Sequence, residues 1–103
     1  MTLITITTHE NVVAAHRQQI ASTVEATLIE ARVPVNGIVR RIFALPDFAP
    51  AQGEHFVSIE IVFPSSQRSL FLERIRDDIA NRLQQIGISP DSYLLIIPGA
   101  TSA

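Results

Sequence analysis

Two adjacent arginines, Arg40 and Arg41, are the residues best suited to chemistry in this sequence. A guanidinium group binds a carboxylate through two parallel hydrogen bonds, so these side chains could hold a small anionic ligand. They lie in a run rich in β-branched and apolar residues, Gly37 to Leu45, which predicts a strand. Neighbouring strand residues point to opposite faces, so we expect one arginine on each face of the sheet. The alternative is an ion pair with Glu60, or with an acidic neighbour, across a subunit interface.

The amino-terminal amine is the second candidate, because an amine can act as a general base. It belongs to Met1, or to Thr2 if Met1 is removed. A shift of one residue moves the group to the opposite side of a strand, so the two possibilities are not equivalent. Phe43 is a candidate for the apolar wall of a pocket beside these groups. The alternative for Phe43 is packing in the core or in an interface.

Composition excludes several other classes of function. The three histidines show no spacing typical of metal ligands, and the sequence has no cysteine, so we expect no metal site and no disulfide. The sequence also contains no glycine-rich phosphate loop, and we expect no cofactor. A net charge of -2 argues against binding to nucleic acid. No apolar run approaches the roughly 20 residues of a membrane span, and no signal peptide is evident, so we expect a cytoplasmic protein.

These candidates must be positioned by a pattern of strands and helices that occurs twice. Alternating or continuous apolar residues predict four strands, over 1–8, 37–45, 56–63 and 92–97. The first amphipathic helix is expected to begin in the polar segment 8–11 and to end before Val33-Pro34. The second is expected to begin at 64–66, with a serine as its cap, and to end at Gly87.

The two halves of the sequence align without gaps at a single offset, 59 − 4 = 55, which places Ile4 on Ile59 and Leu28 on Leu83. We therefore predict one domain over 1–103, built from tandem β-α-β units over 1–46 and 56–98 with a linker loop over 46–55. Crossovers of this kind give parallel strand pairs. The predicted fold class is α+β, with a four-stranded mixed sheet and two helices on one face.

Two helices on one face leave the other face of the sheet uncovered, and that face is predicted to be apolar. The residues expected on it are Leu3, Val39, Phe43, Val57, Leu94 and Ile96, or their neighbours. Hydrophobic residues make up 47% of the chain, which is high for a small monomer. We therefore expect the chain to self-associate, with a second subunit covering this face.

The segment Val33-Pro-Val-Asn-Gly-Ile-Val-Arg-Arg-Ile-Phe-Ala-Leu-Pro46 resembles the tautomerase superfamily, in which Val-Pro after the first helix leads into the second strand. The segment Ile86-Gly-Ile-Ser-Pro-Asp91 resembles the stretch before that family's fourth strand. The similarity is greatest to the branches of malonate semialdehyde decarboxylase and cis-3-chloroacrylic acid dehalogenase. It implies the tautomerase or macrophage-migration-inhibitory-factor-like fold, a homotrimer, and a small carboxylate as ligand.

The same resemblance implies a catalytic amino-terminal proline, and this sequence departs from that pattern. Met1 stands at the position of the proline. Other positions at which family members carry functional side chains are occupied here by Asn11, Gly37, Phe63 and Ser65.

Arg40 falls close to a substrate-binding arginine of some tautomerases, and Arg68 could replace arginines that follow the third strand. Because Met1 stands in place of the proline, we expect loss of the proline-dependent chemistry. The alternatives are an active enzyme that uses the amine of Met1 or Thr2 on a small 2-oxo acid, and an inert subunit or ligand-binding oligomer.

Overall fold

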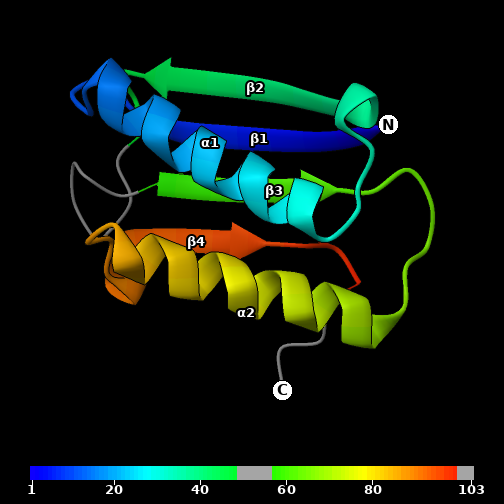
Figure 1. Ribbon diagram of the computed structural model, residues 1–103. Helices are drawn as coiled ribbons and strands as arrows, with labels where there is room; N and C mark the ends of the chain where they lie inside the picture. The colour runs from blue at the N-terminus through cyan, green and yellow to red at the C-terminus, as the bar shows by residue number, and fades with distance from the viewer. Residues whose placement is uncertain (49–56, 100–103) are drawn as a thin grey trace.

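The computed structural model describes residues 1–48 and 57–99 and shows an α+β fold, in which two helices cover one face of a four-stranded mixed sheet (Figure 1). The strands are β1 (Thr2–His9), β2 (Ile38–Leu45), β3 (Val57–Val62) and β4 (Tyr93–Ile96), in the spatial order β2-β1-β3-β4. β1 pairs parallel with β2 and antiparallel with β3, and β3 pairs parallel with β4. The predicted fold class is confirmed.

The two helices reproduce the offset of the sequence repeat. Helix α1 (Ala14–Glu30) and helix α2 (Ser69–Gln85) each have 17 residues, and their first residues differ by 69 − 14 = 55. The short 3-10 turns η1 (Val35–Gly37) and η2 (Pro90–Ser92), which precede β2 and β4, keep the same offset, 90 − 35 = 55. The predicted linker over 46–55 lies mostly outside the described residues.

Both predicted helix starts are wrong by several residues. β1 continues through His9 because its ladder with β2 extends that far, so the polar residues that follow form a turn instead of a cap. Helix α1 begins four residues after Glu10, and α2 begins at Ser69 instead of 64–66. The N-cap residues, Val13 and Arg68, make no side-chain capping bond. The first backbone amides of each helix are therefore left to other partners or to water.

The core lies between the helices and one face of the sheet. Alternate residues of β1 from Thr2 to Thr8 are buried, as the period of a strand requires. They pack with β3 and with the inner faces of the helices, whose largest fully buried members are Ile20, Val24, Leu28, Ile75, Ile79 and Leu83. The buried stripes of α1 and α2 occupy equivalent positions in the two repeats, so each repeat contributes one half of a shared core.

The opposite face of the sheet, here called the open face, carries no described helix (Figure 1). Its exposed large apolar residues are Phe43, Leu45, Val62, Leu94 and Ile96. The prediction that placed Val57 here is wrong, because Val57 pairs with buried Thr8 and itself faces the helices. The open face of β3 is formed by Ser58, Glu60 and Val62, which alternate with its buried residues. Exposed large apolar residues gathered on one face are typical of a contact surface.

Candidate functional site

A surface hollow of about 320 Å³ lies beside the start of β1. Its walls come from the first residue of β1, from the segment that follows α1, and from the segment that connects β3 with α2, together with Phe71 in the first turn of α2. Thr2, Arg32, Pro34, Phe63, Gln67 and Phe71 are among the residues that line it. The hollow therefore forms where the first repeat meets the entry to the second helix.

Arg32 is held at this hollow by an unusual backbone conformation. Helix α1 ends in a turn in which the Val33 N–H donates to the Leu28 carbonyl at 3.0 Å, and Arg32 takes a φ of 70°. The equivalent residue after α2 is Gly87, with a φ of 86°. A residue with a side chain adopts this left-handed conformation at a cost of roughly 1–2 kcal/mol. The fold thus carries an arginine where glycine would be less strained.

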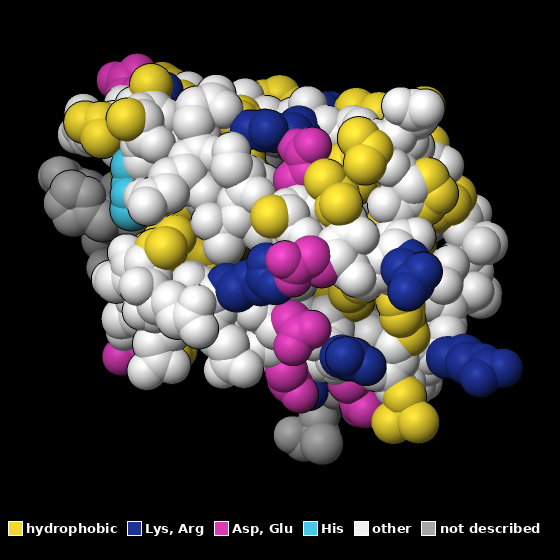
Figure 2. Space-filling model, in the orientation of Figure 1, with side chains coloured by type: hydrophobic (Ala, Val, Ile, Leu, Met, Phe, Trp, Pro, Cys, Tyr) yellow, Lys and Arg dark blue, Asp and Glu magenta, His cyan; other side chains and the backbone are white. Residues whose placement is uncertain are grey.

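The guanidinium group of Arg32 has no ion pair or hydrogen bond to another residue in the described part of the chain. A second hollow of about 340 Å³ lies between the helices, shares Arg32 and Phe71 with the first, and is lined by further charged side chains. There, Arg74 lies 3.9 Å from Asp78, and Glu30 pairs with Arg82. Figure 2 shows these acidic and basic side chains gathered between the helices. Arg32 is therefore the free cation of the first hollow, among the residues that the structure describes.

The remainder of the first hollow is mainly apolar. Phe63 and Phe71 meet edge to face, with ring centroids 5.8 Å apart, and Pro34 adds to the same wall. Thr2 and Gln67 supply polar atoms, and Thr2 is only 4% exposed. One cation above an apolar wall with few polar groups is the arrangement that binds a small carboxylate with an apolar body.

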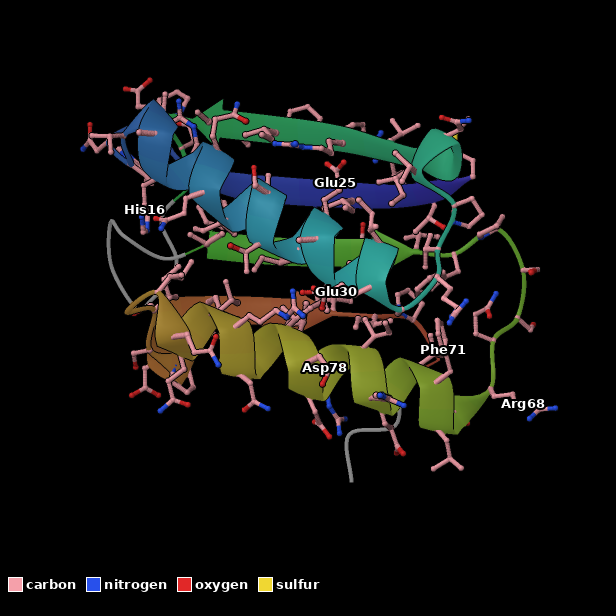
Figure 3. The ribbon with its side chains drawn as sticks, in the orientation of Figure 1. His16, Glu25, Glu30, Arg68, Phe71 and Asp78 are labelled. Atoms are coloured by element: carbon pink, nitrogen blue, oxygen red, sulfur yellow. The ribbon has the colours of Figure 1, made fainter. Side chains whose placement is uncertain are left out.

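Of the residues predicted from sequence for a site, only Thr2 lines this hollow. Met1 is 75% exposed and does not line it. Arg40 faces the helices, where its guanidinium donates to Glu25 Oε2 and Gln18 Oε1, both at 2.9 Å. Glu25, which lies on α1, is labelled in Figure 3. The guanidinium of Arg40 is therefore engaged within the subunit.

The other three predicted residues lie elsewhere. Arg41 is on the open face, as expected for the neighbour of Arg40, and donates to Thr5 Oγ1 at 3.2 Å. Its guanidinium carbon also lies 5.9 Å from the centroid of the Phe43 ring on the same face. Arg68 is exposed immediately before α2, and Figure 3 shows its side chain extending away from the protein. The structure does not bring these residues together with Thr2.

Arg32 was not predicted from the sequence, although the repeat contains a signal for it. The offset of 55 places Arg32 on Gly87, since 87 − 32 = 55. Glycine immediately after a helix indicates a left-handed residue, so its counterpart in the other repeat is expected to share that conformation. An arginine in that conformation is uncommon, which makes the position a candidate for a role beyond folding.

Within residues 1–48 and 57–99, no group of three or more His, Cys, Asp or Glu side chains could hold a metal ion. Within the same ranges, neither helix is long and apolar enough to cross a membrane. Burial raises the pKa of the Tyr93 hydroxyl, which lies at the start of β4 and packs against the core.

Comparison of the sequence with known protein families and with curated proteins gives no match. Comparison of the structure gives many. FG41 malonate semialdehyde decarboxylase, inhibited by 3-bromopropiolate, is similar with a TM-score of 0.77 and 20% identity, over 92% of this chain and 80% of that one. A macrophage migration inhibitory factor-like protein from Entamoeba histolytica has a TM-score of 0.68 and 17% identity, over 93% and 85% of the two chains.

A fused 4-OT symmetric trimer is also similar, with a TM-score of 0.67 and 9% identity, over 92% of this chain and 82% of that one. These structures are members of the tautomerase superfamily. At such low identities the likeness shows a shared fold. The chain described here therefore has the tautomerase and macrophage-migration-inhibitory-factor-like fold.

Proposed function

We propose that this chain is a tautomerase-superfamily protein that binds a small carboxylate in the hollow beside Thr2, with Arg32 as the anion contact. We propose further that it lacks the proline-dependent tautomerase and decarboxylase chemistry. The observation that carries the proposal is Arg32, strained and without a partner in the described residues, at an apolar hollow. The similar decarboxylase, inhibited by 3-bromopropiolate, supports a ligand of this chemical class.

The hollow provides separate contacts for the carboxylate and for the body of the ligand. The carboxylate oxygens accept hydrogen bonds from the guanidinium of Arg32, which is exposed, so solvent screens part of this charge-assisted contact. The body of the ligand packs against the edge-to-face pair Phe63 and Phe71. Gln67 and Thr2 provide the polar groups that orient it. A volume of about 320 Å³ suits a small acid with an aromatic or short aliphatic body.

The loss of proline chemistry rests on the residue at the start of the chain. Met1 stands where the resemblance implies a proline, and its side chain is exposed. The alternative is an active enzyme that uses an amino-terminal amine on a 2-oxo acid. The observation that favours this alternative is the position of Thr2, whose amine would lie at the hollow if Met1 were removed.

Self-association as a homotrimer is part of the proposal. The open face presents five exposed large apolar residues, named above, that the subunit itself leaves uncovered in its described part. β2 lies at an edge of the described sheet, where a strand of another subunit could pair with it. The similar 4-OT trimer supports assembly of this kind. A cytoplasmic location remains a prediction from the sequence.

The binding proposal is tested by calorimetric titration with phenylpyruvate. The informative variant is Arg32→Gly, because glycine accepts a φ of 70° and preserves the turn. We expect it to weaken binding by about tenfold or more, which corresponds to about 1.4 kcal/mol. Arg68→Ala removes an exposed arginine outside the hollow and is the matched control, expected to bind as the parent does. Equal affinity of the Arg32→Gly variant and the parent would contradict the proposal.

The proposed loss of catalysis is tested separately. The parent protein is assayed for ketonisation of phenylpyruvate enol and for decarboxylation of malonate semialdehyde. A second variant, Thr2→Pro, exposes proline when the initiating methionine is removed, and mass spectrometry verifies the processed terminus. Activity only in this variant supports the proposal. Activity in the parent supports the amine-dependent alternative instead.

A further inference from the structure

We propose that, when open faces meet, Arg41 of one subunit forms an ion pair with Glu60 of the next, and that this pair sets the register of assembly. The inference rests on the self-association proposed above. It adds the specific contact by which a second copy of this chain is selected over other apolar surfaces.

The first step is the register of the sheet. Thr5 on β1 pairs with Arg41 on β2 and with Glu60 on β3, so the three side chains form one row across the open face. Strands are spaced by roughly 4.8 Å, so the two charged residues are about 9.6 Å apart at their Cα atoms. The row carries one positive and one negative charge on a face that is otherwise largely apolar.

The second step is that neither charge is paired within the described residues. Arg41 is held by Thr5 Oγ1 and by the ring of Phe43, and neither contact neutralises it. Glu60 is half-buried and has no ion pair or hydrogen bond from another side chain in the described ranges. Thr5 and Phe43 thus hold the arginine in place without compensating its charge, and no described residue forms an ion pair with the carboxylate.

The third step is the cost of covering this row. On either side of it lie apolar residues of the open face, including Leu3, Val62 and Leu94. A partner that buries this face and leaves a charge unpaired incurs a penalty of several kcal/mol. A partner that brings an acid to Arg41 and a base to Glu60 avoids that penalty. A second copy carries both groups on the same face, so each subunit of a closed ring can supply one of each.

The test is a charge-reversal cycle followed by sedimentation velocity over a range of protein concentrations. The variants are Arg41→Glu, Glu60→Arg and the double reversal. We expect each single reversal to raise the dissociation constant of the assembly by about tenfold or more, and the double reversal to restore most of that loss. Arg68→Glu is the control, because it reverses an exposed charge outside the open face, and we expect it to assemble as the parent does.

The outcomes separate this inference from the proposal beneath it. A parent protein that is monomeric at micromolar concentration overturns both self-association and the ion pair. A parent that assembles, with single reversals whose effects simply add in the double variant, overturns the pair and leaves self-association standing. Circular dichroism establishes that each variant is folded. Should a reversal fail to fold, the neutral changes Arg41→Gln and Glu60→Gln form the same cycle, and non-additive effects are then the expected result.

Discussion

The two repeats of this protein end their helices in the same turn but with different residues. α1 and α2 have equal lengths, and each is followed by a residue with positive φ, Arg32 in the first repeat and Gly87 in the second. Glycine relieves the strain of this conformation, and arginine does not. The arginine also lies at the hollow beside Thr2. The fold therefore determines the backbone conformation of the turn, while the side chain at this position is free to differ between the repeats.

The largest effect is expected where the repeats are equivalent. Leu28 and Leu83 are both fully buried and lie at matching positions of α1 and α2. Replacing either with alanine should lower the free energy of unfolding by about 3 kcal/mol, through lost burial and the cavity that remains. Chemical denaturation at one fixed protein concentration measures both. A clear difference between the two losses would contradict the view that the repeats share the core equally.

A smaller effect is expected at Gly87, where the repeats use the same backbone conformation. No atom lies within 4 Å of a Cβ placed on Gly87, so Gly87→Ala introduces no clash. The cost is the left-handed conformation alone, and we expect a loss of about 1 kcal/mol in the free energy of unfolding. Ala80→Gly, in the middle of α2, is a useful comparison, because there the glycine is the destabilising residue. An unchanged stability of Gly87→Ala would show that this turn imposes no strain.

The reverse change, Arg32→Gly, should raise stability slightly. It relieves the strained conformation, but glycine also increases the entropy of the unfolded chain, so the net gain is expected to stay under about 1 kcal/mol. Arg32→Ala is the matched control, since it removes the guanidinium and keeps the strain. Thermal unfolding should distinguish the two, while phenylpyruvate binding should be weakened in both. If Arg32→Gly gains stability and still binds phenylpyruvate as the parent does, the strained conformation has no connection with ligand binding.

Much of the fold was predictable because it is encoded in local patterns. The alternation in β1 and the helical stripes gave the four strands, the two helices and the uncovered face. The helix starts were not predictable in this way, because Val13 and Arg68 provide no capping side chain and the extent of β1 depends on its partner strand. The ion pair of Arg40 with Glu25 was not predictable from local patterns either, because the two residues belong to different segments of the chain.

The hollow was the least predictable feature. Its residues come from three separate segments, and the position of its cation depends on the positive φ angle of Arg32. Sequence periodicity reports which face a side chain occupies, but it does not report whether a guanidinium is paired. Thr2 was predicted as a carrier of the amino-terminal amine, and its place in a hollow follows from the fold. Arg32 required the comparison of two helix ends, which the offset of 55 makes possible.

The smallest expected effect concerns another position at which the repeats differ, Tyr93 in the place of Ile38. Burial raises the pKa of the Tyr93 hydroxyl above its ordinary value of about 10. The folded state therefore retains this proton more strongly than the unfolded chain does. The stability that depends on it is complete below pH about 10 and is lost as the pH rises through the folded pKa.

The composition makes this titration easy to isolate. The sequence has one tyrosine and no cysteine, and its eight basic residues other than histidine are all arginine, which stays charged in this range. We expect the free energy of unfolding of the parent to fall above pH about 10, and that of Tyr93→Phe to fall much less. Denaturation at several alkaline pH values measures both, with tyrosinate absorbance reporting the ionisation directly. A parent and variant that lose stability in parallel would show that Tyr93 ionises equally in the folded and unfolded states. That result would contradict a buried hydroxyl at this position.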